Sequence, residues 1–339
     1  MKVGIIGAGI AGLTLAHTLA EAGITVSVLD KGNRVGGRTS TRRTAEWGFD
    51  HGAQYFTVRD PRFYSFLRTH VPSSQISVWS AQFARLVGDK LVAEDAREDR
   101  QVGVPRMSSI CEALATHVSV HSQVEIRKLI LTQGGWILHD TKEHSHGPFD
   151  WVLMTAPPAQ TAELLYGQTS IEDEIRGLCM NPCFSLLIAP SSDQIQFPAD
   201  GIRCEHPILG WVSNNHSKPG RGPQSTLVIH SNHAWAEVHK QRTLLEVGHE
   251  LKRAAVEAFE IDLTRPTYES IHRWLYAAPV EIPKKLYFMD PVARLGACGD
   301  WCCSGRVEGA FLSAIACAER LLVCSSETDS KSAKDLCSE

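Results

Sequence analysis

The spacing of glycines near the start of the chain constrains its fold more than any other feature of the 339-residue sequence. Residues 2–6 have the apolar, β-branched character of a buried strand, and residues 13–20 carry apolar side chains at helical spacing. Between them stand three glycines in the pattern Gly-x-Gly-x-x-Gly. A second apolar strand, residues 25–29, ends at Asp30. This order of strand, glycine turn, helix, strand and acid predicts a Rossmann unit that binds a dinucleotide.

Each glycine has a separate physical task. Gly7 permits the tight turn, Gly9 lets the backbone approach a pyrophosphate, and Gly12 allows close packing of helix on strand. The helix N-terminus offers N–H groups and a partial positive charge to the phosphates. Asp30 is placed to accept hydrogen bonds from ribose hydroxyls, and its charge disfavours NADP at this site. The unit alone leaves open whether the dinucleotide is FAD or NAD.

A second glycine-rich segment follows the acid. Gly36 and Gly37 stand immediately before Arg38, whose guanidinium is a fixed cationic fork for phosphate. A simple NAD-dependent dehydrogenase does not need this extension. The plain structural interpretation of the same residues is a surface loop with a solvated arginine.

These two segments resemble the N-terminal signature of the flavin amine oxidase superfamily, whose members bind FAD. Residues 50–56, Asp-His-Gly-Ala-Gln-Tyr-Phe, are similar to the next segment of that superfamily, and the Gly-Ala-Gln-Tyr within them is similar to renalase-like proteins. The resemblance implies noncovalent FAD and contacts to it from residues in the first part of the chain. These are Gly7, Gly9, Ala11, Gly12, Asp30, Lys31, Gly37, Arg38, Gln54 and Tyr55.

The resemblance returns near the other end of the chain. Residues 295–299 have the pattern of a strand, and residues 307–323 that of a helix of small side chains. By resemblance, Gly299, Asp300 and Gly309 contact FAD, and the helix N-terminus stabilises negative charge on the reduced flavin. A buried packing helix beside a turn is the plain alternative. Cysteines at 302 and 303 lie where some members attach FAD covalently, but the surrounding pattern differs, which favours noncovalent binding.

The sequence predicts an α/β protein with a discontinuous Rossmann-type FAD-binding domain and an inserted α+β substrate domain built on an antiparallel sheet. We assign residues 1–65, 102–165 and 286–325 to the first domain and residues 66–101 and 166–285 to the second. Candidate strands in the second are residues 184–189, 208–212 and 227–230, and residues 244–259 have helical spacing. The polar composition of residues 326–339 predicts a disordered tail.

Three residues of the second domain are candidates for lining the substrate pocket. Trp211 and Trp274 would form an aromatic wall that holds a planar substrate by stacking, and His230 would lie beside them. Trp274 belongs to an Arg-Trp segment similar to one that lies near the flavin in this family. Core tryptophans and a satisfied core histidine remain an equally good interpretation of each residue taken singly.

The resemblance implies an oxidoreductase in which FAD accepts a hydride at N5. Renalase-like proteins suggest isomeric dihydronicotinamides, the 2- and 6-dihydro forms of NAD(P), as donors and O2 as acceptor, with NAD(P)+ and H2O2 as products. Such electron-rich donors need no side-chain acid or base, so no catalytic residue is assigned. A flavin amine oxidase or related desaturase is the enzymatic alternative, and a flavin-binding redox sensor without turnover is the alternative from another class.

Composition excludes several other classes of partner. The formal net charge is −4 and there is no dense Lys/Arg run, so neither nucleic acid nor an anionic membrane surface is an expected partner. No apolar stretch is long enough for a membrane span. The 10 cysteines form no CxxC pair, and the histidine spacings supply no full metal-ligand set. Cysteines inside apolar patterns predict a reducing, cytoplasmic location.

Overall fold

The structure is a computed structural model that describes residues 1–95, 98–191 and 197–336, with side chains described up to residue 325. The chain divides into two compact units, each built from segments that are far apart in the sequence. Unit 1 comprises residues 1–37, 114–179 and 280–339, and unit 2 comprises residues 38–113 and 180–279.

Unit 1 is built on a six-stranded sheet of order β19-β20-β13-β1-β2-β9, parallel except for its edge strand β19. The central strand β1 buries Val3 and Ile5 completely, as expected for a parallel strand covered on both faces. The strands are β1 (Lys2–Ile6), β2 (Thr25–Asp30), β9 (Val120–Ser122), β13 (Trp151–Met154), β19 (Tyr287–Asp290) and β20 (Leu295–Cys298).

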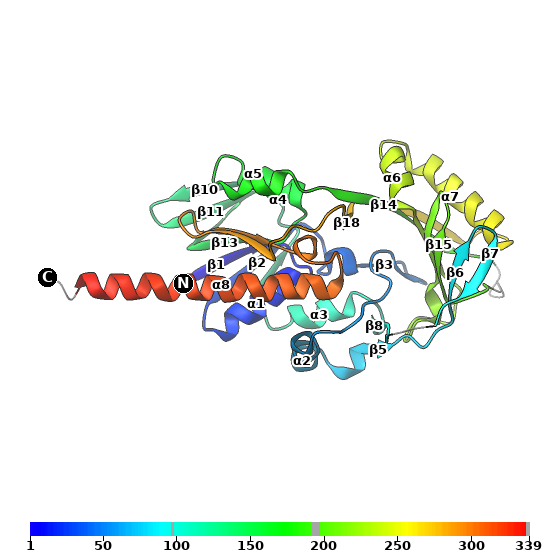
Figure 1. Ribbon diagram of the computed structural model, residues 1–339, viewed down its shortest axis with the longest axis horizontal. Coiled ribbons are helices and arrows are strands. Elements are labelled where there is room, and N and C mark those ends of the chain that lie inside the picture. The colour runs from blue at the N-terminus through cyan, green and yellow to red at the C-terminus, as the bar shows by residue number, and fades with distance from the viewer. Residues whose placement is uncertain (96–97, 192–196, 337–339) are drawn as a thin grey trace. The chain divides into compact units, whose positions relative to one another are not determined.

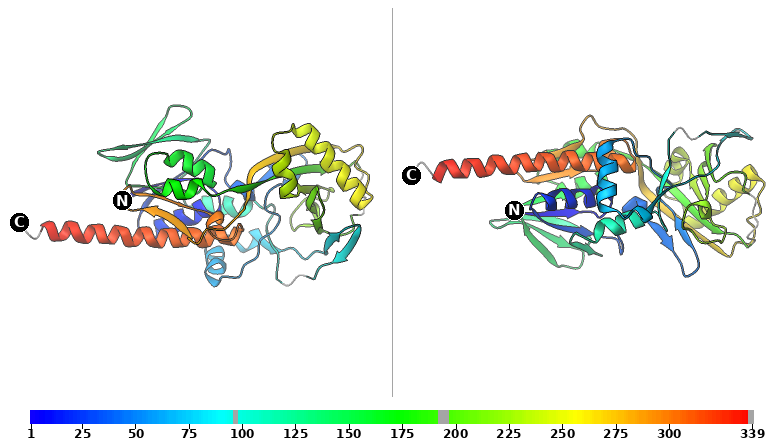
Figure 2. Two further views of the ribbon diagram at one scale, coloured as in Figure 1. Left: turned by 45° about the horizontal axis from the view of Figure 1, so that its top comes forward. Right: turned by 90° about the horizontal axis from the view of Figure 1, so that it is seen from below.

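Two helices of unit 1 come from opposite ends of the chain and pack side by side, as Figures 1 and 2 show. They are α1 (Ile10–Glu21) and α8 (Val307–Leu336). Gly23 follows α1 with a φ of +80°, a left-handed conformation that glycine adopts without strain and that commonly ends a helix. The unit also holds the meander β10 (Ile126–Thr132), β11 (Gly135–Asp140) and β12 (Ser145–Phe149), with the helices α4 (Pro158–Leu165) and α5 (Ile171–Arg176).

Unit 2 is built on a seven-stranded sheet of order β18-β14-β17-β16-β15-β6-β7. All neighbouring pairs are antiparallel except β6 and β15. The strands are β6 (Phe83–Val87), β7 (Lys90–Ala93), β14 (Met180–Ala189), β15 (Gly201–Glu205), β16 (Leu209–Asn214), β17 (Leu227–Ser231) and β18 (Tyr268–Pro279). The predicted antiparallel sheet is therefore present, and it is joined by two strands from the segment before residue 101.

One face of this sheet packs against the helices α6 (His233–His239) and α7 (Leu244–Phe259), which Figure 1 shows over β14 and β15. Helix α7 occupies the predicted residues because Thr243 and Glu246 form a capping box at its start. Its Val247 and Leu251 are fully buried in the core beneath the sheet. The opposite face of the sheet carries a second small core, in which Leu187 and Val228 pack against Phe49.

Short elements complete the chain. They are β3 (Thr41–Arg43), β4 (Gly48–Asp50), β5 (Ile76–Val78), β8 (Gln101–Gly103), α2 (Pro61–His70), α3 (Ser109–Ala115) and the 3-10 turns η1 (Gly37–Thr39), η2 (Ser73–Gln75), η3 (Asn215–Ser217) and η4 (Asp300–Cys302). Among the residues that the structure describes, no helix combines the length and the apolarity needed to cross a bilayer.

The two units differ from the predicted domains at their boundaries. Residues 38–65 and 102–113 belong to unit 2, and residues 166–179 and 280–285 belong to unit 1. The expected disordered tail is wrong for residues 326–336, because α8 continues to Leu336. That polar segment contains no proline or glycine to end a helix. The last three residues of the predicted tail, 337–339, lie outside the described residues.

Candidate functional site

The parallel strands of unit 1 all end at one edge of their sheet, and the predicted dinucleotide residues follow those ends. Gly7 follows β1, Asp30 ends β2, Thr155 follows β13 and Gly299 follows β20. Ligands of open α/β sheets bind at the carboxyl ends of the strands. The sequence-distant residues Gly7, Asp30 and Gly299 are thus placed at the edge of the sheet where such a ligand would lie.

The glycine turn leaves no room for side chains. Gly7 has a φ of +112°, and a Cβ on it would come within 2.5 Å of Thr155 Oγ1. A Cβ on Gly12 would lie 1.9 Å from the carbonyl oxygen of Gly7. Gly9 precedes α1, and no described side chain caps that helix end or adds an acid to its first turn. The N-terminal N–H groups of α1 are therefore a site for an anion.

Asp30 is oriented by two backbone N–H groups. Its Oδ2 accepts a hydrogen bond from Ala8 N at 2.6 Å, and its Oδ1 accepts one from Gly32 N at 2.7 Å. The Ala8 carbonyl in turn accepts from Gly36 N at 2.9 Å. A carboxylate has about four lone-pair positions, so two remain for ligand hydroxyls. Asp30 and Ala8 together therefore tie the glycine turn to the segment after β2, and Asp30 stays half-buried.

The other predicted FAD residues of unit 1 lie around the same turns. Ala11 is buried in the first turn of α1, Lys31 is exposed after β2, and Gly37 opens η1 with a φ of +52°. Asp300 is buried in η4, and its carbonyl oxygen accepts hydrogen bonds from the backbone of the following turn. Gly309 lies in the first turn of α8, where a Cβ would come within 2.4 Å of Ser304 Oγ.

Cys302, the last residue of η4, is a buried thiol, and the following Cys303 is half-buried. Burial raises the pKa of the Cys302 thiol well above its usual range, and the neighbouring Cys317 and Asp300 raise it further. Burial also raises the pKa of Cys303. A thiol becomes a nucleophile only as its thiolate, so neither side chain is activated for a bond to a cofactor.

A buried ionic cluster lies at the centre of unit 2. Asp50, at the end of β4, contacts Lys218 Nζ at 3.3 Å and also forms an ion pair with Arg221. It further accepts hydrogen bonds from Thr41 Oγ1 at 2.7 Å and from Met107 N at 3.0 Å. Burial alone would raise the pKa of the Asp50 carboxyl, but the two cations outweigh it and hold the pKa well below its usual range.

Lys218 is fully buried, with its ammonium surrounded by three acceptors and an aromatic ring. Its Nζ donates to Gln54 Oε1 at 3.0 Å and to Asn215 Oδ1 at 3.1 Å, besides Asp50, and lies 5.3 Å from the centroid of the Trp79 ring. Burial lowers the pKa of Lys218 to about 8, with Asp50 opposing that decrease. With three donors and three acceptors, the ammonium is satisfied within unit 2.

The three predicted pocket residues lie on one face of the seven-stranded sheet, opposite the face that packs on α7. Trp211 on β16 and Ser185 on β14 both stand opposite His230 on β17, and Ser185 also stands opposite His272 on β18. Trp274 follows two residues later on β18, so its side chain is on the same face as His272. The structure therefore brings the predicted pocket residues together and adds His272 to them.

His51 lies against this face and completes a cluster of three imidazoles. Its ring centroid is 5.0 Å from the rings of both His272 and Trp274, and its carbonyl oxygen accepts from Trp274 Nε1 at 2.9 Å. Burial lowers the pKa of His51 to about 3 and those of His230 and His272 to about 4 each. All three imidazoles are therefore neutral near pH 7.

Three predicted FAD residues belong to unit 2. Gln54 is buried, and its amide bonds to Lys218, Ser213 and the backbone of its own turn. The Tyr55 ring lies 5.7 Å from Trp211, with the Arg100 guanidinium 4.9 Å from its centroid. Arg38 donates through Nη1 to the Ala277 carbonyl at 3.4 Å. These contacts place Gln54 and Tyr55 beside the pocket residues Trp211 and His230.

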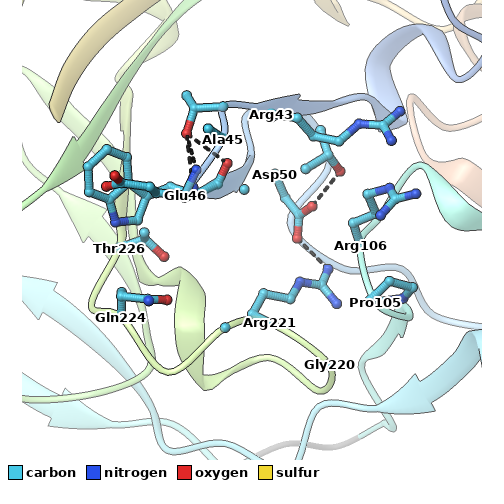
Figure 3. A pocket seen from close by; sticks show the side chains of 15 residues that line it. Arg43, Ala45, Glu46, Asp50, Pro105, Arg106, Gly220, Arg221, Gln224 and Thr226 are labelled. Carbon is cyan, nitrogen blue, oxygen red and sulfur yellow. Dashed lines mark hydrogen bonds and ion pairs between the residues drawn. The ribbon is translucent and has the colours of Figure 1, made fainter.

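A cavity of about 230 Å³ is lined by two members of the ionic cluster, Asp50 and Arg221. Figure 3 shows Asp50 at its base, bonded to Arg221, with Arg43, Arg106 and Glu46 around it. Arg43 and Arg106 both pair with Glu112. The cations of this cavity are thus balanced by carboxylates. Among the described residues, no group of three or more His, Cys, Asp or Glu side chains could hold a metal ion.

Sequence reasoning did not identify Asp50, Lys218 and Arg221 as a unit. Asp50 was seen only as part of the segment 50–56, and neither Lys218 nor Arg221 was singled out. Two of the three partners of Lys218, Asp50 and Gln54, lie more than 160 residues away in sequence. No local pattern marks such a lysine as buried, although a charged pair closing the Pro-Gly turn at residues 218–221 is a weak signal.

Comparison with known proteins finds relatives that share part of this sequence and solved structures that share its fold. Residues 5–69 match the family model described as an NAD(P)-binding Rossmann-like domain, which confirms the predicted Rossmann unit. The bifunctional tRNA 5-methylaminomethyl-2-thiouridine biosynthesis protein MnmC of Magnetococcus marinus is 30% identical over 213 residues, which cover 50% of this chain and 31% of that protein. The flavin-dependent L-tryptophan oxidase RebO of Lentzea aerocolonigenes is 26% identical over 137 residues, 40% of this chain and 28% of that protein. The chain therefore matches less than a third of the length of either relative.

Among solved structures, cyclohexylamine oxidase from Brevibacterium oxydans has the same fold. The TM-score is 0.72, with 94% of this chain and 99% of that chain covered at 13% sequence identity. The predicted mixed α/β fold with a Rossmann-like domain is thereby confirmed as the fold of that amine oxidase. The names of the two oxidases agree with the predicted oxidoreductase.

Proposed function

We propose that this chain is an FAD-dependent oxidase that takes a hydride from an isomeric dihydronicotinamide, the 2- or 6-dihydro form of NAD(P), and delivers the electrons to O2, yielding NAD(P)+ and H2O2. The observation that carries the proposal is the sheet face with Trp211, His230 and Trp274. Its imidazoles are neutral, and among the described residues of β14, β16, β17 and β18 no acidic side chain is on that face. An uncharged planar ring fits such a face.

The residues of unit 1 fit the ADP half of FAD. The tight contacts at Gly7 and Gly12 hold the backbone close to the N-terminus of α1, and Asp30 keeps lone pairs for ribose hydroxyls. When bound, FAD would supply the hydride acceptor at N5 and the electron transfer to O2. We assign pyrophosphate contacts to the α1 N-terminus and ribose contacts to Asp30, with Arg38 as a phosphate partner. The raised pKa of Cys302 supports noncovalent attachment.

The protein's own contribution to the reaction is to bind and orient the donor. An electron-rich dihydronicotinamide needs no proton removed before it gives up its hydride, which agrees with a face of imidazoles that stay neutral down to about pH 4. Tyr55 and Trp211 would hold the donor ring, and the ionic cluster behind Gln54 would keep these side chains rigid.

Anaerobic mixing of the FAD-loaded protein with candidate donors tests the proposal. We expect 2- and 6-dihydro-NAD(P) to bleach the flavin absorbance rapidly, and readmitted O2 to restore it with formation of H2O2. Primary amines and ordinary 4-dihydro-NADH serve as controls. Bleaching by an amine alone would instead establish a flavin amine oxidase, the alternative that the fold of cyclohexylamine oxidase favours.

A chain whose flavin is bleached by none of these donors would be a flavin-binding redox sensor. The cytoplasmic location also stays a proposal. Its support is that cysteines such as Cys183, Cys204 and Cys298 are buried free thiols. Buried thiols in place of disulfides are typical of a reducing compartment.

A further inference from the structure

The carbonyl oxygen of His51 fixes the protonation pattern of His230. It accepts a hydrogen bond from Trp274 Nε1 at 2.9 Å and lies 3.2 Å from His230 Nε2. A carbonyl oxygen can only accept, so the second contact is a hydrogen bond only when His230 Nε2 carries the proton. In a neutral imidazole the other ring nitrogen, Nδ1, then has a lone pair and no proton.

The Gln54 amide does not accept a hydrogen bond from His230 Nε2, because Lys218 fixes the orientation of that amide. The Lys218 ammonium only donates, so the atom it contacts at 3.0 Å is the amide oxygen Oε1, which also accepts from Ser213 Oγ at 2.7 Å. The two N–H bonds of Gln54 Nε2 are used by the carbonyls of Asp50 and Gly52. Gln54 therefore has no N–H left to donate to His230 Nε2 at 3.5 Å, so the His51 carbonyl is the hydrogen-bond partner of that nitrogen.

His230 Nδ1 remains as an acceptor on the sheet face. Among the described residues none donates a hydrogen bond to it, and His230 is half-buried between Ser185 and Trp211 on the neighbouring strands. Burial keeps this imidazole neutral, so the lone pair is present throughout the neutral pH range. A neutral acceptor of this kind binds an N–H donor without the desolvation cost of a charge.

We infer that His230 Nδ1 is a specificity-determining acceptor for the N–H of a primary carboxamide on a planar, uncharged ring, and that Lys218 and Gln54 are positioning residues that hold His230 in the required tautomer. This inference rests on the proposed function where it takes that ring to be the dihydronicotinamide. A ring that carries an acetyl group in place of the carboxamide has the same shape and lacks the N–H.

Flavin reduction by the carboxamide donor and by its 3-acetyl analogue, compared as kcat/KM, tests the assignment. One neutral hydrogen bond corresponds to a preference of about tenfold for the carboxamide. His230→Phe should reduce the ratio to about one, whereas His230→Asn, which restores an acceptor, should retain part of it. His249→Phe changes an exposed histidine on α7 and should keep the wild-type ratio. A wild-type ratio in His230→Phe would overturn the assignment.

Binding measurements separate failure of this inference from failure of the proposed function. If no dihydronicotinamide reduces the flavin, the proposed function fails, but nicotinamide and 3-acetylpyridine can still be compared through the change each causes in flavin absorbance. A preference for nicotinamide that disappears in His230→Phe would then support His230 as a carboxamide acceptor. Equal affinities in the wild type would refute it.

Histidine nitrogen NMR reads the tautomer directly and tests the positioning residues. We expect His230 in the Nε2–H form in the wild type and a mixture of tautomers in Lys218→Met. Ser213→Ala removes only one donor to Gln54 and should leave the tautomer unchanged. The milder Gln54→Leu serves where Lys218→Met does not fold. An Nε2–H form that persists in both Lys218→Met and Gln54→Leu would remove the positioning role, and the Nδ1–H form in the wild type would overturn the whole inference.

Discussion

Asp30 in unit 1 and Asp50 in unit 2 both end short strands, but their surroundings give them opposite roles. Asp30 is half-buried, and in the part of the chain that the structure describes its carboxylate bonds only to the backbone N–H groups of Ala8 and Gly32, which leaves lone pairs for the proposed ribose contacts. Asp50 is fully buried and paired with Lys218 and Arg221. A carboxylate held by neutral N–H groups can serve a ligand, whereas one held by cations is occupied in maintaining the fold.

Loss of the two carboxylates should also cost different amounts of folding free energy. Breaking a buried ion pair by removing one partner leaves the other charge uncompensated and costs about 3–5 kcal/mol. Losing a half-exposed acceptor leaves N–H groups that water can reach, which costs far less. Variants at the two aspartates should therefore fail in different assays.

The largest effect is expected for Asp50→Asn. The variant leaves Lys218 and Arg221 buried without their anion, and we expect a loss of about 3–5 kcal/mol in the free energy of unfolding, measured by urea denaturation. Adding Lys218→Met should recover part of that loss, because one of the two uncompensated charges is then removed. If Asp50→Asn and Asp30→Asn lost the same free energy of unfolding, the two aspartates would contribute equally to the stability of the fold.

Acid should destabilise the surroundings of Asp50 through the neutral histidines. Burial lowers the pKa of His51 from 6.5 to about 3, so this group contributes stability that is complete above pH 6.5 and is lost as the pH falls toward 3. Between pH 7 and pH 4.5 the contribution that is lost is on the order of 3 kcal/mol. His51→Gln should show a smaller loss over this range. If the free energy of unfolding fell equally with pH in wild type and variant, His51 would not be the cause of the acid destabilisation.

Gly12→Ala tests the proposed FAD site of unit 1. The added Cβ would lie 1.9 Å from the Gly7 carbonyl, so α1 must move away from β1. Overpacking of this kind costs about 1–3 kcal/mol, and the displaced helix N-terminus should also bind FAD more weakly. Gly23→Ala is not a suitable control because of its positive φ, but Gly134→Ala, in an exposed turn with open space around it, is. Unchanged FAD retention on dialysis would rule out the close approach.

The smallest change in stability is expected for Asp30→Asn. The amide keeps one acceptor for Ala8 or Gly32 and loses the charge, so we expect unfolding to change by less than about 1 kcal/mol and FAD affinity to fall about tenfold. Titration of the apoprotein with FAD measures the affinity. Full affinity with reduced stability would reverse the roles assigned to the two aspartates.

The difference between the two regions also explains what the sequence could predict. The Asp30 region depends on residues that follow one another, so its strand, glycine turn, helix and acid were all visible as a pattern. Helix α7 was equally visible because its capping box and apolar stripe are local. The Asp50 region depends on pairs separated by more than 160 residues, such as Asp50 with Lys218 and Gln54 with Lys218. The charged pair that closes the Pro-Gly turn at residues 218–221 is only a weak local signal that Lys218 differs from an exposed loop lysine.

The sheet face with Trp211, His230 and Trp274 could be predicted in part. Trp211, His230 and Trp274 could be chosen as aromatic and imidazole side chains in candidate strands, but their common face follows from the register of β16, β17 and β18 with β14. A shift of one residue in any strand would turn its side chain to the core. His272 was missed although it stands two residues before Trp274. His51 was missed because 223 residues separate it from Trp274, and only the fold places these rings together.

The interleaving of the two units has a consequence for how the protein is made. Strand β1 leaves the ribosome among the first residues, but it pairs with β13, and β13 pairs with β20, which follows only at residues 295–298. Throughout most of synthesis, the edge of β13 that β20 will cover has no partner strand. An unpaired apolar strand edge is a site of aggregation, and such long-range pairing is slow. Chaperones that shield nascent chains should therefore determine the yield of this protein more than its final stability does.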